Sequence, residues 1–194
     1  MIDMLLTKMK GFLLNPVETF RQSKTEDLTT VFSYFGVLLL IDAILTAVIA
    51  AFGIENTEMF AGLSLGVAVP ILVFFMMLIG GFIVTFILAA WIHLWVYILG
   101  GRKGIMQTVN AVIYGSTPRM LLGWIPFIGI IFLLWSLVLS VLGIRELQEL
   151  STGKAILAVV IAVIIPLILL VLLAAWLYSS VMTVTAVPVV PAYS

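Results

Sequence analysis

Long stretches without a charged side chain constrain this chain more than any other feature of its sequence. Uncharged runs of about 18 residues or more recur along it, and a helix of about that length crosses the ~30 Å hydrocarbon core of a bilayer. Charged residues make up 9% of the chain, whereas soluble domains carry roughly a quarter. The apolar runs are continuous rather than alternating, which argues against a β-barrel. We therefore expect an all-α integral membrane protein.

Other counts exclude whole classes of site. The chain has no cysteine, which excludes a disulfide framework, a thiolate metal site and a cysteine nucleophile. Its net charge is zero, so no overall field favours nucleic acid as a partner. Charged residues interrupt the first 28 positions before any long apolar run. We therefore expect no cleavable signal peptide, and the first span is expected to act as the insertion signal.

Residues 1–25 are expected to form short helices that lie in the cytoplasmic interface of the membrane. In the first segment, "MIDMLLTKMKGFLL", apolar side chains recur at helical spacing while Lys8 and Lys10 lie on other faces, a pattern typical of an amphipathic surface helix. In "NPVETF", Asn15 suits a helix cap and Pro16 suits the first helical position.

The rest of the chain predicts a five-span bundle over residues 26–178, followed by an extended extracytoplasmic tail over residues 179–194. The expected transmembrane helices cover about 27–52, 67–99, 105–121, 125–143 and 154–178. A single long crossing over 105–143 is the alternative for the third and fourth spans.

The placement of positive charge favours two crossings in that segment. Arg119 is the only charged residue between 105 and 143. With two crossings, eight of the nine lysines and arginines lie in cytoplasmic segments, as the positive-inside rule requires. Pro118 disfavours helix at Thr117, directly before Arg119. We expect a hairpin here, a multi-pass cell-membrane protein, a cytoplasmic N-terminus and an extracytoplasmic C-terminus.

Asp42 and Arg119 are the first candidates for a functional role, because ionisable side chains at membrane depth are costly. They can pair if the arginine side chain reaches inward. Alternatively, Arg119 extends outward to lipid phosphates and Asp42 is protonated or bonded to hydroxyl groups. The sequence leaves both arrangements open.

Further polar side chains lie in the expected third span. Gln107, Asn110 and Tyr114 share one helix face, where they would either hold helices together or line a small cavity with Asp42 and Arg119. His93, in "WIHLWVY", is a weaker candidate. It fits an aromatic belt at the membrane interface, and a lone histidine is not a metal site.

Motifs for catalysis are missing. The segment "STGK" is not a phosphate loop, because Gln148 and Ala155 occupy positions that require glycine and serine or threonine. The spans supply no convergent set of catalytic groups. We expect no enzymatic activity, no catalytic residue, no cofactor and no metal.

Three segments together resemble the Yip domain family, which is similar to the eukaryotic Ypt/Rab-interacting proteins. They are "NPVETFR", "GGRKGIMQTVNAVIYGSTPRMLL" and "SVLGIRELQELSTGKA". The resemblance implies a five-helix bundle with a cytoplasmic N-terminus and, in eukaryotic members, vesicle transport, small-GTPase binding and association with other family members. This chain lacks a long N-terminal domain and a "DLYGP"-like motif, so it resembles a prokaryotic member, and GTPase binding is not assumed.

Two functional interpretations remain. The first is a non-catalytic scaffold or adaptor that organises membrane lipids or a protein partner, with self-association as one form of it. The second is a small transporter or channel whose path is lined by the polar groups inside the bundle. A dry, closely packed interior favours the first, and a continuous polar path from Asp42 favours the second.

Overall fold

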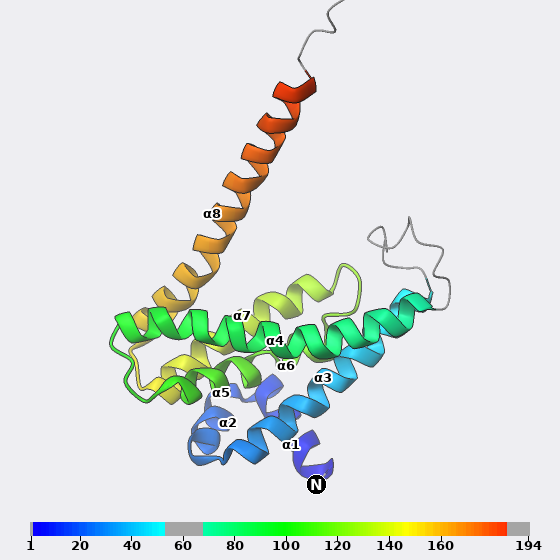
Figure 1. Ribbon diagram of the computed structural model, residues 1–194. Helices are drawn as coiled ribbons and strands as arrows, with labels where there is room; N and C mark the ends of the chain where they lie inside the picture. The colour runs from blue at the N-terminus through cyan, green and yellow to red at the C-terminus, as the bar shows by residue number, and fades with distance from the viewer. Residues whose placement is uncertain (1, 53–67, 186–194) are drawn as a thin grey trace, which may run out of the picture.

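The computed structural model describes residues 2–52 and 68–185, and every regular element in these ranges is helical (Figure 1). In chain order they are α1 (Ile2–Leu14), α2 (Pro16–Gln22), the 3₁₀ turn η1 (Ser23–Thr25), α3 (Leu28–Ala51), α4 (Ala68–Ile98), α5 (Ile105–Gly115), α6 (Thr117–Leu122), α7 (Gly129–Gln148) and α8 (Thr152–Thr185). Within the described residues, four helices are long and apolar enough to cross a membrane: α3, α4, α7 and α8.

Local signals at the helix ends explain where several elements begin and stop. Asp27 caps α3, where its side chain accepts a hydrogen bond from the Thr30 backbone N–H at 3.3 Å. Gly104 precedes α5 with a φ of 89°, a backbone conformation that glycine adopts without strain. Glu149 ends α7 in the left-handed conformation, which is a common helix stop.

The predicted third span, residues 105–121, is divided into two short helices. α5 ends at Gly115, and α6 restarts at Thr117 with Pro118 in its first turn. Pro118 has no backbone N–H to donate to the preceding turn, and the Thr117 hydroxyl donates instead to the Tyr114 carbonyl at 2.7 Å. The break lies at Ser116, one residue before Thr117, where Pro118 was expected to disfavour helix, and neither piece is long enough to cross a membrane alone.

Helix α5 is surrounded by protein rather than by lipid. Every side chain from Thr108 to Gly115 is buried. The helix runs antiparallel to α7, because Thr108 bonds Gln148 while Gly115 lies beside Ser140. A Cβ added at Gly115 would lie 2.6 Å from the Ser140 hydroxyl oxygen and 2.9 Å from its backbone nitrogen. Glycine at this position therefore allows the two helices to approach closely.

Helix α1 packs one of its faces on the bundle, while its expected position in the membrane interface stays a prediction. Leu5, Met9 and Phe12 are 8%, 7% and 0% exposed and belong to the main hydrophobic core. Met4 and Leu6 are 56% and 57% exposed, so apolar surface remains on the two flanks of the buried face.

Helix α8 joins the bundle through its first three turns alone. Small residues there, including Ala155, Ala158 and Ala162, are buried against α4 and α7. From 163 to 182 every side chain is exposed or half-buried, and Figure 1 shows the helix leaving the others. It continues to Thr185, so the extended tail predicted from residue 179 is wrong for 179–185, and the rest of that tail lies outside the described residues.

Candidate functional site

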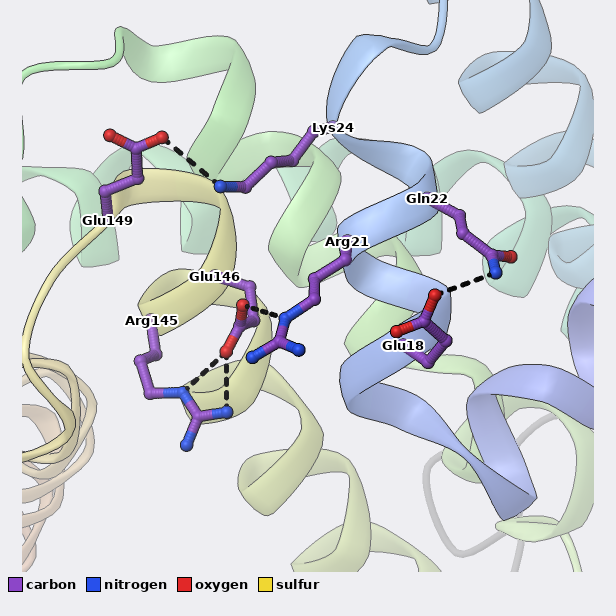
Figure 2. A network of polar contacts seen from close by, with 7 residues as sticks. All are labelled: Glu18, Arg21, Gln22, Lys24, Arg145, Glu146 and Glu149. Atoms are coloured by element: carbon purple, nitrogen blue, oxygen red, sulfur yellow. Dashed lines mark hydrogen bonds and ion pairs between the residues drawn. The ribbon is translucent and has the colours of Figure 1, made fainter.

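Charged side chains gather where α2, η1 and the 100–104 turn meet the C-terminal end of α7, a region we call the basic end (Figure 2). Arg21 Nε lies 3.0 Å from Glu146 Oε2. Glu149 binds two lysines, with Lys24 Nζ at 3.2 Å and Lys103 Nζ at 2.6 Å. These pairs attach the N-terminal segment and the 100–104 turn to the end of α7.

Solvent exposure limits what these pairs contribute to stability. The Arg21 side chain is 57% exposed and that of Glu149 is 52% exposed, and exposed ion pairs contribute about 0–1 kcal/mol each. Hydrogen bonds from Lys103 and Lys24 lower the pKa of Glu149, and the hydrogen bond to Glu146 raises the pKa of Arg21. The basic end is therefore a charged surface with defined side-chain positions, and its solvated ion pairs add little to stability.

Four aromatic rings form a cluster beneath the N-terminal helices. Phe12 lies 4.8 Å from Phe20 and stacks on Tyr114 at 4.6 Å, between ring centroids. Tyr34 meets Tyr114 edge-on at 5.2 Å. All four side chains are 0% exposed. The cluster joins α1, α2, α3 and α5 into one packed unit.

The hydroxyl of Tyr114 reaches from this cluster to an ion pair. It donates a hydrogen bond to Glu26, which also binds Lys8. The Lys8 ammonium lies 4.9 Å from the centroid of the Tyr114 ring, within the range of a cation–π interaction. The side chains of Lys8 and Glu26 are only 12% and 21% exposed. Sequence reasoning singled out Tyr114 but missed this network, because its members lie 88 and 106 residues away in the chain.

Asp42 and Arg119 lie at the limit of an ion pair. Arg119 Nη1 is 4.0 Å from Asp42 Oδ2, and the two side chains are 39% and 10% exposed. The Arg119 backbone N–H donates to the Ser136 hydroxyl at 3.0 Å, which fixes α6 against α7. The structure thus brings together the two residues whose pairing the sequence left open, with a long and partly solvated contact.

The five predicted polar residues do not form one cluster. Gln107 donates to the Lys24 carbonyl at 3.3 Å, at the basic end, while Tyr114 belongs to the aromatic cluster. Asn110 is 3% exposed, and its Oδ1 is buried without a hydrogen-bond partner among the residues that the structure describes. Asp42 and Arg119 contact each other, so the five side chains take part in separate contacts rather than in one hydrogen-bonded cluster.

His93 takes part in a link that ties three helices together. Its Nδ1 lies 2.8 Å from the Thr108 hydroxyl, which also accepts a hydrogen bond from Gln148 Nε2 at 2.9 Å. Gln148 donates in addition to the Gly104 carbonyl at 2.7 Å. Sequence reasoning missed Thr108 and Gln148. A search of residues 2–52 and 68–185 finds no group of three His, Cys, Asp or Glu side chains that could hold a metal ion.

Comparison with family models adds evidence that is independent of this geometry. A model described as the Yip1 domain matches residues 10–175. The chain belongs to the Yip1 domain family. The matched region of this Yip1 domain contains the basic end, the aromatic residues of α2, α3 and α5, and the Asp42–Arg119 pair, whereas Lys8 precedes it. Neither a curated protein nor a solved structure matches the chain.

Proposed function

We propose that this Yip1 domain protein is a non-catalytic scaffold or adaptor that organises a lipid or protein partner in the membrane. The observation that carries the proposal is the packing of the interior polar groups. Tyr114, Asn110 and Asp42 are 0%, 3% and 7% exposed. Side chains that would have to line a path for a solute are instead packed between helices, which favours a structural role over a transport role.

The proposal places the basic end in the cytoplasm and the far end of α8 outside the cell. The basic end carries four positive side chains, Arg21, Lys24, Lys103 and Arg145. Positive residues that flank membrane segments remain in the cytoplasm. A charged face with defined side-chain positions can meet lipid headgroups or a protein, and the resemblance to Ypt/Rab-interacting proteins supports a role in membrane organisation.

Transport is the second candidate, and the Asp42–Arg119 pair is the observation that favours it. Arg119 is partly exposed while Asp42 is nearly buried, and paired ionisable groups at membrane depth often mark an ion or proton pathway. The pair would open when a passing proton neutralised Asp42 or a passing cation bound its carboxylate, and would close again when the proton or cation left.

Reconstitution distinguishes the two functions. Purified protein in liposomes is tested for proton and ion flux with internal dyes, and the scaffold predicts the flux of protein-free liposomes. In parallel, the photocrosslinker p-benzoylphenylalanine is placed at Glu18, at the basic end, or at the lipid-facing Ile87 as a matched control. The scaffold predicts a discrete crosslinked product from native membranes at Glu18 alone. Flux that is lost in Arg119→Ala without a change in melting temperature would instead establish transport.

A further inference from the structure

A cavity lies between α1, α2, η1 and the start of α3. It has a volume of about 450 Å³. Its lining includes charged and hydroxyl-bearing side chains from α1, from η1 and from the residues around the start of α3: Asp3, Thr7, Lys8, Ser23, Glu26 and Thr30. The ion-paired residues of Figure 2 are absent from the lining of the cavity, and nothing in the proposed scaffold function so far uses it.

One buried group in the cavity wall lacks a partner. Ser23 is 1% exposed, and within the described part of the chain its hydroxyl oxygen has no hydrogen-bond partner. Leaving a buried polar group unsatisfied costs about 1–3 kcal/mol. A ligand that forms a hydrogen bond with this hydroxyl would remove that cost, so the unsatisfied Ser23 hydroxyl indicates that the cavity binds a ligand.

The charges of the lining indicate the chemistry of the occupant. Lys8 is already bound by Glu26 and the Tyr114 hydroxyl, so its ammonium is not free for an anion. Glu26 accepts hydrogen bonds from Lys8 and from the Tyr114 hydroxyl on the same oxygen, Oε2, which leaves Oε1 as an acceptor. Asp3 adds a second, exposed carboxylate. With two carboxylates against one lysine, the cavity favours a ligand that brings positive charge and hydrogen-bond donors.

Apolar surface beside the cavity places it close to lipid. Met4 lines the cavity and is 56% exposed, and Leu6 on the same helix is 57% exposed. Exposed apolar side chains on an amphipathic helix at the end of a membrane bundle lie at the boundary between headgroups and acyl chains. The cavity therefore opens at the depth where lipid headgroups are found.

We propose that this cavity binds a primary ammonium group, which donates hydrogen bonds to Glu26, Asp3 and Ser23. Such a group is carried by aminophospholipids such as phosphatidylethanolamine and also by small soluble amines. This inference names the chemistry of a lipid partner and so deepens the proposed function. It rests on that function for the position of the basic end beside lipid.

The test uses the full chain in nanodiscs of phosphatidylcholine, to which phosphatidylethanolamine or phosphatidylglycerol is added, and in detergent with free ethanolamine. Melting temperature and native mass spectrometry report binding. We expect phosphatidylethanolamine to raise the melting temperature and to remain bound, while phosphatidylglycerol does neither. A response to ethanolamine as strong as the response to the lipid would assign the site to soluble amines. Equal responses to both lipids, or none to either lipid or to ethanolamine, would overturn the proposal.

Two variants separate binding from folding. Ser23→Ala removes an unsatisfied hydroxyl, so without ligand its melting temperature is expected to equal or exceed that of the wild type. Its affinity for phosphatidylethanolamine is expected to fall about tenfold, the effect of one lost hydrogen bond to a charged group. Asp3→Asn should weaken binding in the same direction.

Ser33→Ala is the matched control for Ser23→Ala, because Ser33 is an exposed serine on α3 outside the cavity lining. It should bind the lipid as the wild type does. Wild-type affinity in both Ser23→Ala and Asp3→Asn would refute the site. Liposome flux and crosslinking at Glu18 test the scaffold independently, so either proposal can fail alone.

Discussion

The docking of α1 makes a prediction that separates a packed helix from one that rests on lipid. Phe12 is 0% exposed and contacts Phe20, Tyr34 and Tyr114 at ring-centroid distances of 4.8, 6.1 and 4.6 Å. Truncation of a buried phenylalanine to alanine costs about 3–5 kcal/mol, since it removes transferred apolar surface and leaves a cavity. Phe12→Ala should therefore lower the free energy of unfolding by about that amount.

The measurement is an unfolding titration of purified protein in mild detergent, followed by the fluorescence of its five tryptophans. Leu6→Ala is the matched control on the same helix, because Leu6 is 57% exposed, and surface changes of this kind usually stay within about 0.5 kcal/mol. If Phe12→Ala and Leu6→Ala differ by less than about 0.5 kcal/mol, α1 is not packed on the bundle and the reasoning fails.

Three further perturbations test other contacts. Gly115→Ala should destabilise the protein by about 1–3 kcal/mol, because its Cβ would collide with the α7 backbone. Gly36→Ala, which has open space around it, should be neutral or stabilise the protein by up to about 1 kcal/mol. Equal effects of the two variants in denaturation would contradict the close packing of α5 and α7. A double-mutant cycle of Asp42→Asn and Arg119→Ala should give a coupling of about 1 kcal/mol or less, as the long, partly exposed pair predicts, and a much larger value would reveal a tighter pair. Hydrogen bonds from lysines hold the pKa of Glu149 below its usual 4.5. The stability that this carboxylate contributes is therefore present above its usual pKa and is lost as the pH falls through the lowered pKa. Melting temperatures between about pH 6 and pH 3 should depend less on pH in Glu149→Gln than in the wild type, and identical profiles would argue against the pairs.

Some of the fold could be read from the sequence because it depends on local chemistry. Apolar run length alone predicts α3, α4, α7 and α8, the helices that are long and apolar enough to cross a membrane among the described residues. Pro118 predicts a break in the segment before Arg119, and the structure places that break at Ser116. The sequence did not reveal that the predicted third span is divided into α5 and α6, or that α5 is buried among other helices, since hydropathy does not distinguish a helix buried in protein from one surrounded by lipid.

The candidate site was harder to predict because its contacts are distant in the chain. Asp42 and Arg119 were found by the rarity of charge inside apolar runs. Glu26 carries no such signal, because it lies among ordinary surface charges and its partner Tyr114 follows 88 residues later. For α1, the apolar residues cover more than one face, so spacing alone could not decide which face packs on protein.

The contact between Lys8 and Tyr114 also constrains the order of events during synthesis. These residues are 106 positions apart, so at about 5–20 residues per second the ribosome needs roughly 5–20 s to make the second after the first. During that interval the apolar face of α1 has no α5 to pack against, and the membrane surface is the nearest apolar phase. The docked position of α1 against Tyr114 therefore becomes available only after α5 has been made.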